Sequence, residues 1–107
     1  MLFRSVSQSR YEAWYNKGNT LKELKRYDEA LNHYDKAIHL KPDYAQAWNN
    51  KAITLQELKR YEEALNHYDK AIQLKPDYNE AWYNKGNTLK ELKRYWQVYD
   101  LSYGDSR

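Results

Sequence analysis

Apolar side chains recur along this chain at steps of three and four residues, the spacing that places them on one face of a helix. The first such stripe consists of Ala13, Trp14, Gly18, Leu21 and Leu24. After a short break, a second stripe consists of Ala30, Leu31, Tyr34, Ala37 and Ile38. The pattern predicts two helices joined by a turn near residues 25–27.

This two-helix pattern repeats with a period of 34 residues. The sixteen letters EAWYNKGNTLKELKRY occur at residues 12–27 and again, unchanged, at 80–95. Units 11–44 and 45–78 differ at only eight positions, and a third unit starts at Asn79 and leaves the pattern after residue 95. Self-similarity at such a period is typical of repeat proteins, in which each unit buries its apolar face against the next.

The ends of the helices also have sequence signals. Ser9, Asp43 and Asp77 each stand three residues before a Glu or Gln, the spacing of a capping box, so each is predicted to cap the first helix of a unit. Pro42 and Pro76 directly precede two of these residues and predict that the preceding helix ends there. Residues 1–8 lie outside the pattern, and we expect a poorly ordered leader there, followed by a single domain of residues 9–107.

Composition favours an extended stack over a thick globule. Of the 107 residues, 41% are hydrophobic and 31% charged, which leaves little material for a deep core, whereas 16% are aromatic, too many for a disordered chain. The 18 basic and 15 acidic residues are interspersed and give a net charge of only +3. This balance indicates no strong preference for nucleic acid or for an anionic membrane.

Several classes of function have no support in the sequence. The absence of Cys excludes disulfides and thiolate chemistry, and no nucleophile with a base, phosphate loop or carboxylate pair stands out. His33 and His67 share one repeat position, and His39 is too far along the helix to share a metal with His33. We therefore expect a non-catalytic protein without metal or cofactor. No apolar run reaches the ~20 residues of a membrane-spanning helix or suits a secretory signal, so a cytoplasmic location is expected.

Several unrelated side-chain requirements recur in register within the units. Position four is Trp, eight is Gly or Ala, twenty is Ala, twenty-four is Tyr, twenty-seven is Ala and thirty-two is Pro. In this set the chain resembles the tetratricopeptide repeat family over residues 11–95. The resemblance implies an all-α, right-handed superhelical stack of about two and a half antiparallel helical hairpins, the third unit being 79–107 with an atypical final helix. It also implies a protein–protein interaction module.

Two features depart from the family. Lys17, Lys51 and Lys85 stand at position seven, where Leu is usual, and we expect each stem to lie along the packing with its ammonium in water. After residue 95 the second-helix signature is lost and Val98 replaces the small Ala, which predicts a short, poorly seated second helix beside an open apolar end. Such an end favours association with another copy. The side chains predicted to associate are Trp82, Leu89, Trp96 and Tyr99.

The resemblance further implies that the first helices of the units line a concave face that binds an extended peptide. Asn amides both donate to and accept from a peptide bond, and Tyr rings add apolar area. Asn16, Asn50 and Asn84 share one repeat position and resemble the asparagine ladders of peptide-holding family members. The residues predicted to bind are Tyr15, Asn16, Asn19, Asn49, Asn50, Ile53, Tyr83, Asn84 and Asn87.

One subfamily, the chaperone adaptors, grips an acidic C-terminal tail with two Asn and three cationic side chains. Asn19 and Asn50 match the two Asn. The cationic places hold Tyr15, Glu80 and Asn84 instead. Without those charges a terminal carboxylate loses its charge-assisted hydrogen bonds, so this clamp is not expected here.

Other interpretations of the same residues stay open. Asn at the ladder position belongs to the family consensus and could bond neighbouring helices instead of a ligand. Near-identical units also arise by recent duplication or by construction, so the chain could be a fragment or an engineered scaffold that assembles with copies of itself. Basic pairs at 25–26, 59–60 and 93–94 would line one edge, where phosphates could bind, although acidic neighbours favour a solvated edge.

Overall fold

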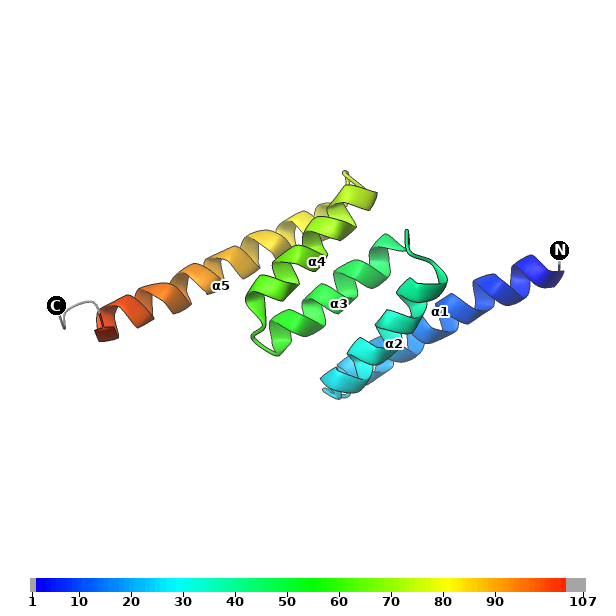
Figure 1. Cartoon of the computed structure of the whole chain (residues 1–107), viewed down its shortest axis with the longest axis horizontal. Helices are drawn as coiled ribbons and strands as arrows, with labels where there is room; N and C mark the ends of the chain where they lie inside the picture. Colours follow the sequence, from blue (N-terminus) through cyan, green and yellow to red (C-terminus); the bar gives the residue numbers. More distant parts are fainter. Residues whose placement is uncertain (1, 104–107) are drawn as a thin grey trace.

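The computed structural model describes residues 2–103, which form five α-helices and no strand. The helices are α1 (Leu2–Glu23), α2 (Tyr27–Leu40), α3 (Ala45–Glu57), α4 (Tyr61–Leu74) and α5 (Asn79–Tyr103). Each helix packs against the next in chain order, so the chain zigzags along one row from α1 to α5 (Figure 1). The molecule measures 67 × 29 × 18 Å, which is an extended stack and not a globule. The predicted all-α stack of helical hairpins is therefore confirmed.

Two clusters of buried side chains hold the stack together. Leu21, Ala30 and Tyr34 pack between α1 and α2. The second cluster spans α2, α3 and α4 and consists of Leu31, Ala52, Leu55, Ala64 and Tyr68. A Cβ atom added to Gly18 would lie 2.8 Å from Cε1 of Tyr34, closer than packed carbons approach. The small residue at position eight therefore makes room for the Tyr ring of the second helix.

The turn inside each complete hairpin is closed by backbone hydrogen bonds. The amide of Lys25 donates to the carbonyl of Lys22 at 2.9 Å, and the amide of Arg26 donates to the carbonyl of Leu21 at 2.8 Å. This is the Schellman pattern, in which one residue adopts a left-handed conformation that usually favours Gly. Here the residue is Lys25 with φ 63°, and Lys59 with φ 62° takes the same place in the second hairpin. Each turn thus carries the conformational cost of a side chain at positive φ.

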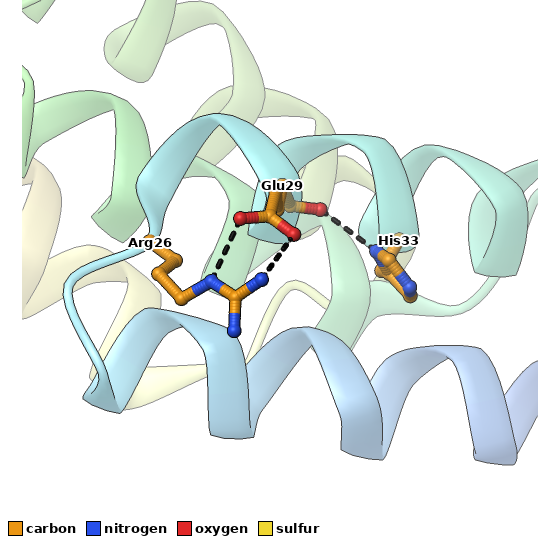
Figure 2. Close-up of polar contacts among 3 residues, drawn as sticks. All are labelled: Arg26, Glu29 and His33. Atoms are coloured by element: carbon orange, nitrogen blue, oxygen red, sulfur yellow. Dashed lines mark hydrogen bonds and ion pairs between the residues drawn. The ribbon is translucent and has the colours of Figure 1, made fainter.

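An ion pair follows each of these turns. Nε and Nη2 of Arg26 each donate to one carboxylate oxygen of Glu29 at 2.7 Å, in the first turn of α2 (Figure 2). The Arg26 guanidinium holds the pKa of the Glu29 carboxyl below its usual value. Arg60 and Glu63 repeat this geometry at 2.8 Å. The pair fastens the turn to the start of the second helix.

The third unit does not form a hairpin. α5 runs without a break from Asn79 to Tyr103, so the turn and short second helix predicted after residue 95 are wrong, and residues 95–103 extend the first helix instead. Val98 replaces the small Ala that seats α2 and α4, and Gln97 replaces the Glu that anchors the Arg. Arg94 pairs backwards with Glu91 at 3.1 Å. Without these contacts nothing offsets the cost of a left-handed Lys.

The predicted capping boxes are also wrong where the structure tests them. Ser9 lies inside α1, which begins at Leu2. Tyr44 directly precedes α3 and makes no side-chain cap bond, while the Asp43 carboxylate lies 3.1 Å from Nζ of Lys41. The link is held instead by Trp48, whose Nε1 donates to the carbonyl of Pro42 at 2.8 Å. Residues 2–8 are helical, and the domain boundary expected at residue 9 stays a prediction.

The unbroken α5 can be tested with three identical substitutions. Lys25→Gly and Lys59→Gly are expected to raise the free energy of unfolding by about 0.5–1 kcal/mol each, because Gly adopts positive φ without strain. Lys93→Gly is expected to lower helical content and not to stabilise, because it lies inside a helix. Urea denaturation followed by circular dichroism measures both quantities. Stabilisation by Lys93→Gly equal to that at Lys25 would mean that the third unit contains the turn.

Candidate functional site: the face of the first helices

The face predicted to bind a peptide is formed by α1, α3 and the first half of α5. Its predicted residues differ widely in exposure. Asn16 and Tyr83 are exposed, and Asn49 is fully buried. The half-buried residues are Tyr15, Asn19, Asn50, Ile53, Asn84 and Asn87. The structure thus divides the predicted set into side chains that reach solvent and side chains that lie between helices.

A chain of hydrogen bonds joins α1, α2 and α3 at this face. Nδ2 of Asn50 donates to the hydroxyl of Tyr15 at 2.9 Å and to Oδ1 of Asn19 at 2.8 Å. The same Oδ1 accepts the hydroxyl of Tyr34 at 2.5 Å. Burial raises the pKa of both Tyr hydroxyls, which therefore stay protonated and able to donate at neutral pH. Asn50 is a bridge between the first two units.

A second set of bonds joins α3 to the start of α5. Nδ2 of Asn49 donates to Oε1 of Glu80 at 3.0 Å and to the hydroxyl of Tyr78 at 3.4 Å. Burial raises the pKa of Tyr78 to about 12. Oδ1 of Asn49 has no hydrogen-bond partner within residues 2–103. Because Asn49 is enclosed, it can act on a ligand only by holding Glu80 and Tyr78 in place.

The buried Tyr hydroxyl has a different hydrogen-bond acceptor in each of the two complete units. In the first unit, Tyr34 donates to Asn19. In the second unit, Ile53 takes the place of Asn19, and Tyr68 donates instead to Oε1 of Gln56 at 2.7 Å. The hydroxyl of Thr88 on α5 also lies 2.7 Å from this oxygen. Gln56 therefore joins the second unit to the third.

Gln56 and Thr88 are not among the residues predicted to bind a peptide. A signal for Gln56 was present among the eight differences between the first two units. Asn19 becomes Ile53 where Lys22 becomes Gln56, so an amide is lost at one position and gained one helical turn later. This paired exchange on one helix face indicates that the buried Tyr hydroxyl needs an amide acceptor in both units and obtains it from two different positions.

The Lys residues at position seven link neighbouring units. Nζ of Lys51 on α3 lies 2.6 Å from Oδ1 of Asp35 on α2, and Nζ of Lys85 on α5 lies 2.7 Å from Oδ1 of Asp69 on α4. The Lys side chains are only 18% and 28% exposed. The expected position along the packing is thus confirmed for these two, whereas Lys17 is exposed. The ammonium groups of Lys51 and Lys85 bind carboxylates instead of water alone.

The basic edge is compensated by acidic partners. Arg26 and Arg60 each pair with a Glu of the following helix turn, and Arg94 pairs with Glu91. Nδ1 of His33 lies 2.8 Å from the carbonyl oxygen of Glu29 beside the first of these pairs (Figure 2). Within the described residues no three metal-ligating side chains lie together. At this edge each Arg is therefore paired, whereas Lys25, Lys59 and Lys93 are exposed and make no ion pair within the described residues.

The far end of the stack presents apolar side chains on α5. Trp82, Leu89, Trp96 and Tyr99, the residues predicted to self-associate, are each about half exposed. The Trp96 ring contacts that of Tyr99 edge to face, with the centroids 5.6 Å apart. A hollow of about 770 Å³ lies between the first turn of α4 and the end of α5. No helix formed by residues 2–103 is long and apolar enough to span a bilayer.

The bridging role of Asn50 can be separated from a ligand role. Asn50→Ala is expected to lower the free energy of unfolding by about 1–3 kcal/mol, because Asn19 loses a half-buried donor. Asn16→Ala, at the same repeat position in the first unit, is expected to change it by less than about 0.5 kcal/mol, because Asn16 is exposed. Thermal and urea denaturation measure the difference. Equal effects of the two substitutions on the free energy of unfolding would mean that Asn50 does not bridge the two units.

The fold is similar to two solved domains. One is the Arabidopsis OM64 TPR domain, with a TM-score of 0.77 and 28% identity over 83% of this chain and 74% of that chain. The other is the second TPR of Spaghetti (RPAP3) bound to the HSP90 peptide SRMEEVD, with a TM-score of 0.79 and 22% identity over 88% of this chain and 86% of that chain. At that identity the second likeness shows the fold alone.

Sequence comparison assigns the repeats themselves. No curated protein matches the chain. The family described as Tetratricopeptide repeat matches residues 11–44 and 45–78, which together make up more than half of the chain. These are the same two units that the period delimits and that form the two hairpins of the structure. The chain therefore belongs to the tetratricopeptide repeat family.

Proposed function

We propose that this chain is a non-catalytic protein-interaction module that binds an extended peptide segment on the face formed by α1, α3 and α5. One observation carries the proposal. Asn16, Asn84 and Asn87 make no side-chain hydrogen bond within the described residues, although other amides on this face are bonded to neighbouring helices. Open amides on helices held in register by internal bonds are suited to pair with the backbone of a bound segment.

The charges around these amides favour a neutral or basic segment. The resemblance to the family assigns repeat positions two, five, six, nine, twelve and thirteen to this face, and these positions carry more acid than base, although the whole chain is positive. The acidic side chains there are Glu12, Glu23, Glu57, Glu80 and Glu91, against Lys22 and Lys90. Glu80 is held by Asn49 at one of the places where an acidic-tail clamp needs a cation. An acidic tail such as the peptide bound to the Spaghetti domain would meet like charge here.

The location and the class of the partner are also proposals. We propose a cytoplasmic protein partner and no nucleic acid, because each Arg of the basic edge has a Glu partner and only one Lys per unit is left there as an open cation. Phosphate contacts require open cations, and binding through them weakens steeply with salt. No cofactor or metal is part of the proposal.

Peptide binding can be tested with a triple variant. A peptide array of neutral, basic and acidic segments identifies a ligand, and isothermal titration measures its affinity. Asn16→Ala/Asn84→Ala/Asn87→Ala is expected to weaken binding at least about tenfold, because three backbone partners are lost. Its melting temperature is expected to stay that of the parent, because none of the three amides joins two helices.

The matched control uses two Asn on the second helices. Asn32 on α2 and Asn66 on α4 are exposed and do not belong to the predicted face. Asn32→Ala/Asn66→Ala is expected to leave affinity unchanged. Full affinity in the triple variant, or a loss confined to this control, would place the ligand on another surface. Preference of the array for acidic tails would contradict the charge argument.

An alternative function, assembly with copies of itself, has one observation in its favour. The exposed apolar side chains on α5 form a large surface for a chain of this size. Sedimentation velocity over a range of concentrations tests it. A dimer that becomes a monomer in Trp96→Gln would support the alternative, whereas a monomer at every concentration would dismiss it.

A further inference from the structure

We propose that the first half of α5 is an acceptor for one amphipathic helix of a partner protein, a helix that carries the pattern Ala-x-x-x-Tyr-x-x-Ala found in α2. The acceptor face consists of Trp82, Gly86, Asn87 and Leu89. Of the three open amides proposed for peptide binding only Asn87 belongs to this face, so the proposal does not depend on peptide binding at Asn16 and Asn84.

The acceptor face has the same residues as a surface of α1 that is covered by another helix. Residues 80–95 repeat residues 12–27 without a change, and in α1 the corresponding surface is covered by α2. Leu21 is 6% exposed, whereas Leu89, at the same repeat position, is 47% exposed. A Cβ on Gly18 would meet the Tyr34 ring, whereas one on Gly86 would meet nothing within 4 Å. The face of α5 is the same packing surface without its helix.

The contacts of α2 with α1 show which side chains a helix needs in order to pack on this face. Tyr34 lies over Gly18 and donates its hydroxyl to Asn19 at 2.5 Å. Ala30, four residues earlier, packs in the same cluster with Leu21. The His33 ring contacts that of Trp14 at a tilt of 53°, with the centroids 5.2 Å apart. The equivalents of the four α1 partners are Gly86, Asn87, Leu89 and Trp82.

Within the described residues this face stays open, since Trp82 and Leu89 are 50% and 47% exposed. Residues 95–103 belong to α5 itself and extend away from the stack (Figure 1). The other side of α5 is occupied by its neighbours, since Ala81 and Thr88 are fully buried. A hollow of about 770 Å³ lies farther along α5, between the first turn of α4 and residues 91–98, and none of the four acceptor residues lines it. A single added helix would lie along α5 next to α4.

A partner protein is favoured over a second copy as the source of this helix. The two helices of this chain that carry the pattern, α2 and α4, are each packed between two neighbours. Their Ala and Tyr side chains are fully buried, as Tyr34 and Tyr68 show. A second copy could offer them only by opening its own hairpin, whereas a separate amphipathic helix needs no such step.

The sequence of α2 provides the first probe. A fluorescein-labelled peptide with the sequence of residues 26–41 is titrated with the full chain, and anisotropy is measured. We expect saturable binding, and we expect the peptide with Tyr34→Ala to bind at least about tenfold more weakly, because the ring that fills the space over Gly86 is lost. A peptide with Ala30→Leu is expected to bind weakly as well, because the larger side chain prevents close approach.

Two substitutions of one glycine locate the site. Gly86→Leu fills the place of the Tyr ring and is expected to weaken binding at least about tenfold without disturbing the fold, because nothing lies near that position. Gly86→Ala is the graded comparison and is expected to weaken binding less than Gly86→Leu, because Ala52 at the same position still clusters with Tyr68, although a Cβ on Gly18 would lie 2.8 Å from the Tyr34 ring. Leu89→Glu is an independent block at an exposed residue.

Four results would overturn the proposal. One is an absence of saturable binding by the peptide. Another is equal binding to the parent, Gly86→Leu and Leu89→Glu chains, which would place the peptide elsewhere. A third is a parent chain that sediments as a dimer and becomes a monomer in Gly86→Leu, which would make a second copy the occupant. The last is loss of this binding in Asn16→Ala/Asn84→Ala with no effect of Gly86→Leu, which would assign the peptide to the face of the open amides.

Discussion

The contact between a Tyr of the second helix and a small residue of the first is the interaction on which the other features of this protein depend. Tyr34 over Gly18, and Tyr68 in one cluster with Ala52, bring the two helices of a unit close together. Each buried ring carries a hydroxyl that needs an acceptor. The acceptors, Asn19 and Gln56, lie on the first helices and are also bonded by the next unit. Packing within a hairpin and stacking between hairpins therefore share the same atoms.

This sharing divides the face of the first helices into two kinds of side chain. Asn16, Asn50 and Asn84 occupy one repeat position, yet only Asn50 donates to both Tyr15 and Asn19 of the preceding unit. Asn84 has no such pair before it, because the second unit carries Asn49 and Ile53 there. The role of a repeated residue is thus set by the unit before it and not by its position alone. The amides left over are the ones that we propose for a ligand.

Much of the architecture could be predicted from the sequence because it rests on local or periodic requirements. The spacing of apolar residues places α2, α3 and α4 within a few residues of their observed bounds, and the small residues at positions eight and twenty mark the helix contacts. The predicted capping boxes were wrong because a side chain in such a short motif can find another partner in the folded protein. Trp48 holds the link through the carbonyl of Pro42, and Asp43 pairs with a Lys instead of a helix end.

The sequence by itself determined the helices, their pairing and the period, because each unit contains the side chains that its own hairpin buries. Only the tertiary structure decided where the last turn would be absent. The letters of residues 12–27 and 80–95 are identical, yet Lys25 adopts φ 63° and the chain reverses, whereas α5 continues through Lys93. A left-handed Lys is unfavourable by itself. The turn forms only where Ala30, Tyr34 and the Arg26–Glu29 pair stabilise the returning helix. Of these residues only Arg26 belongs to the identical letters, and Glu29, Ala30 and Tyr34 lie beyond them.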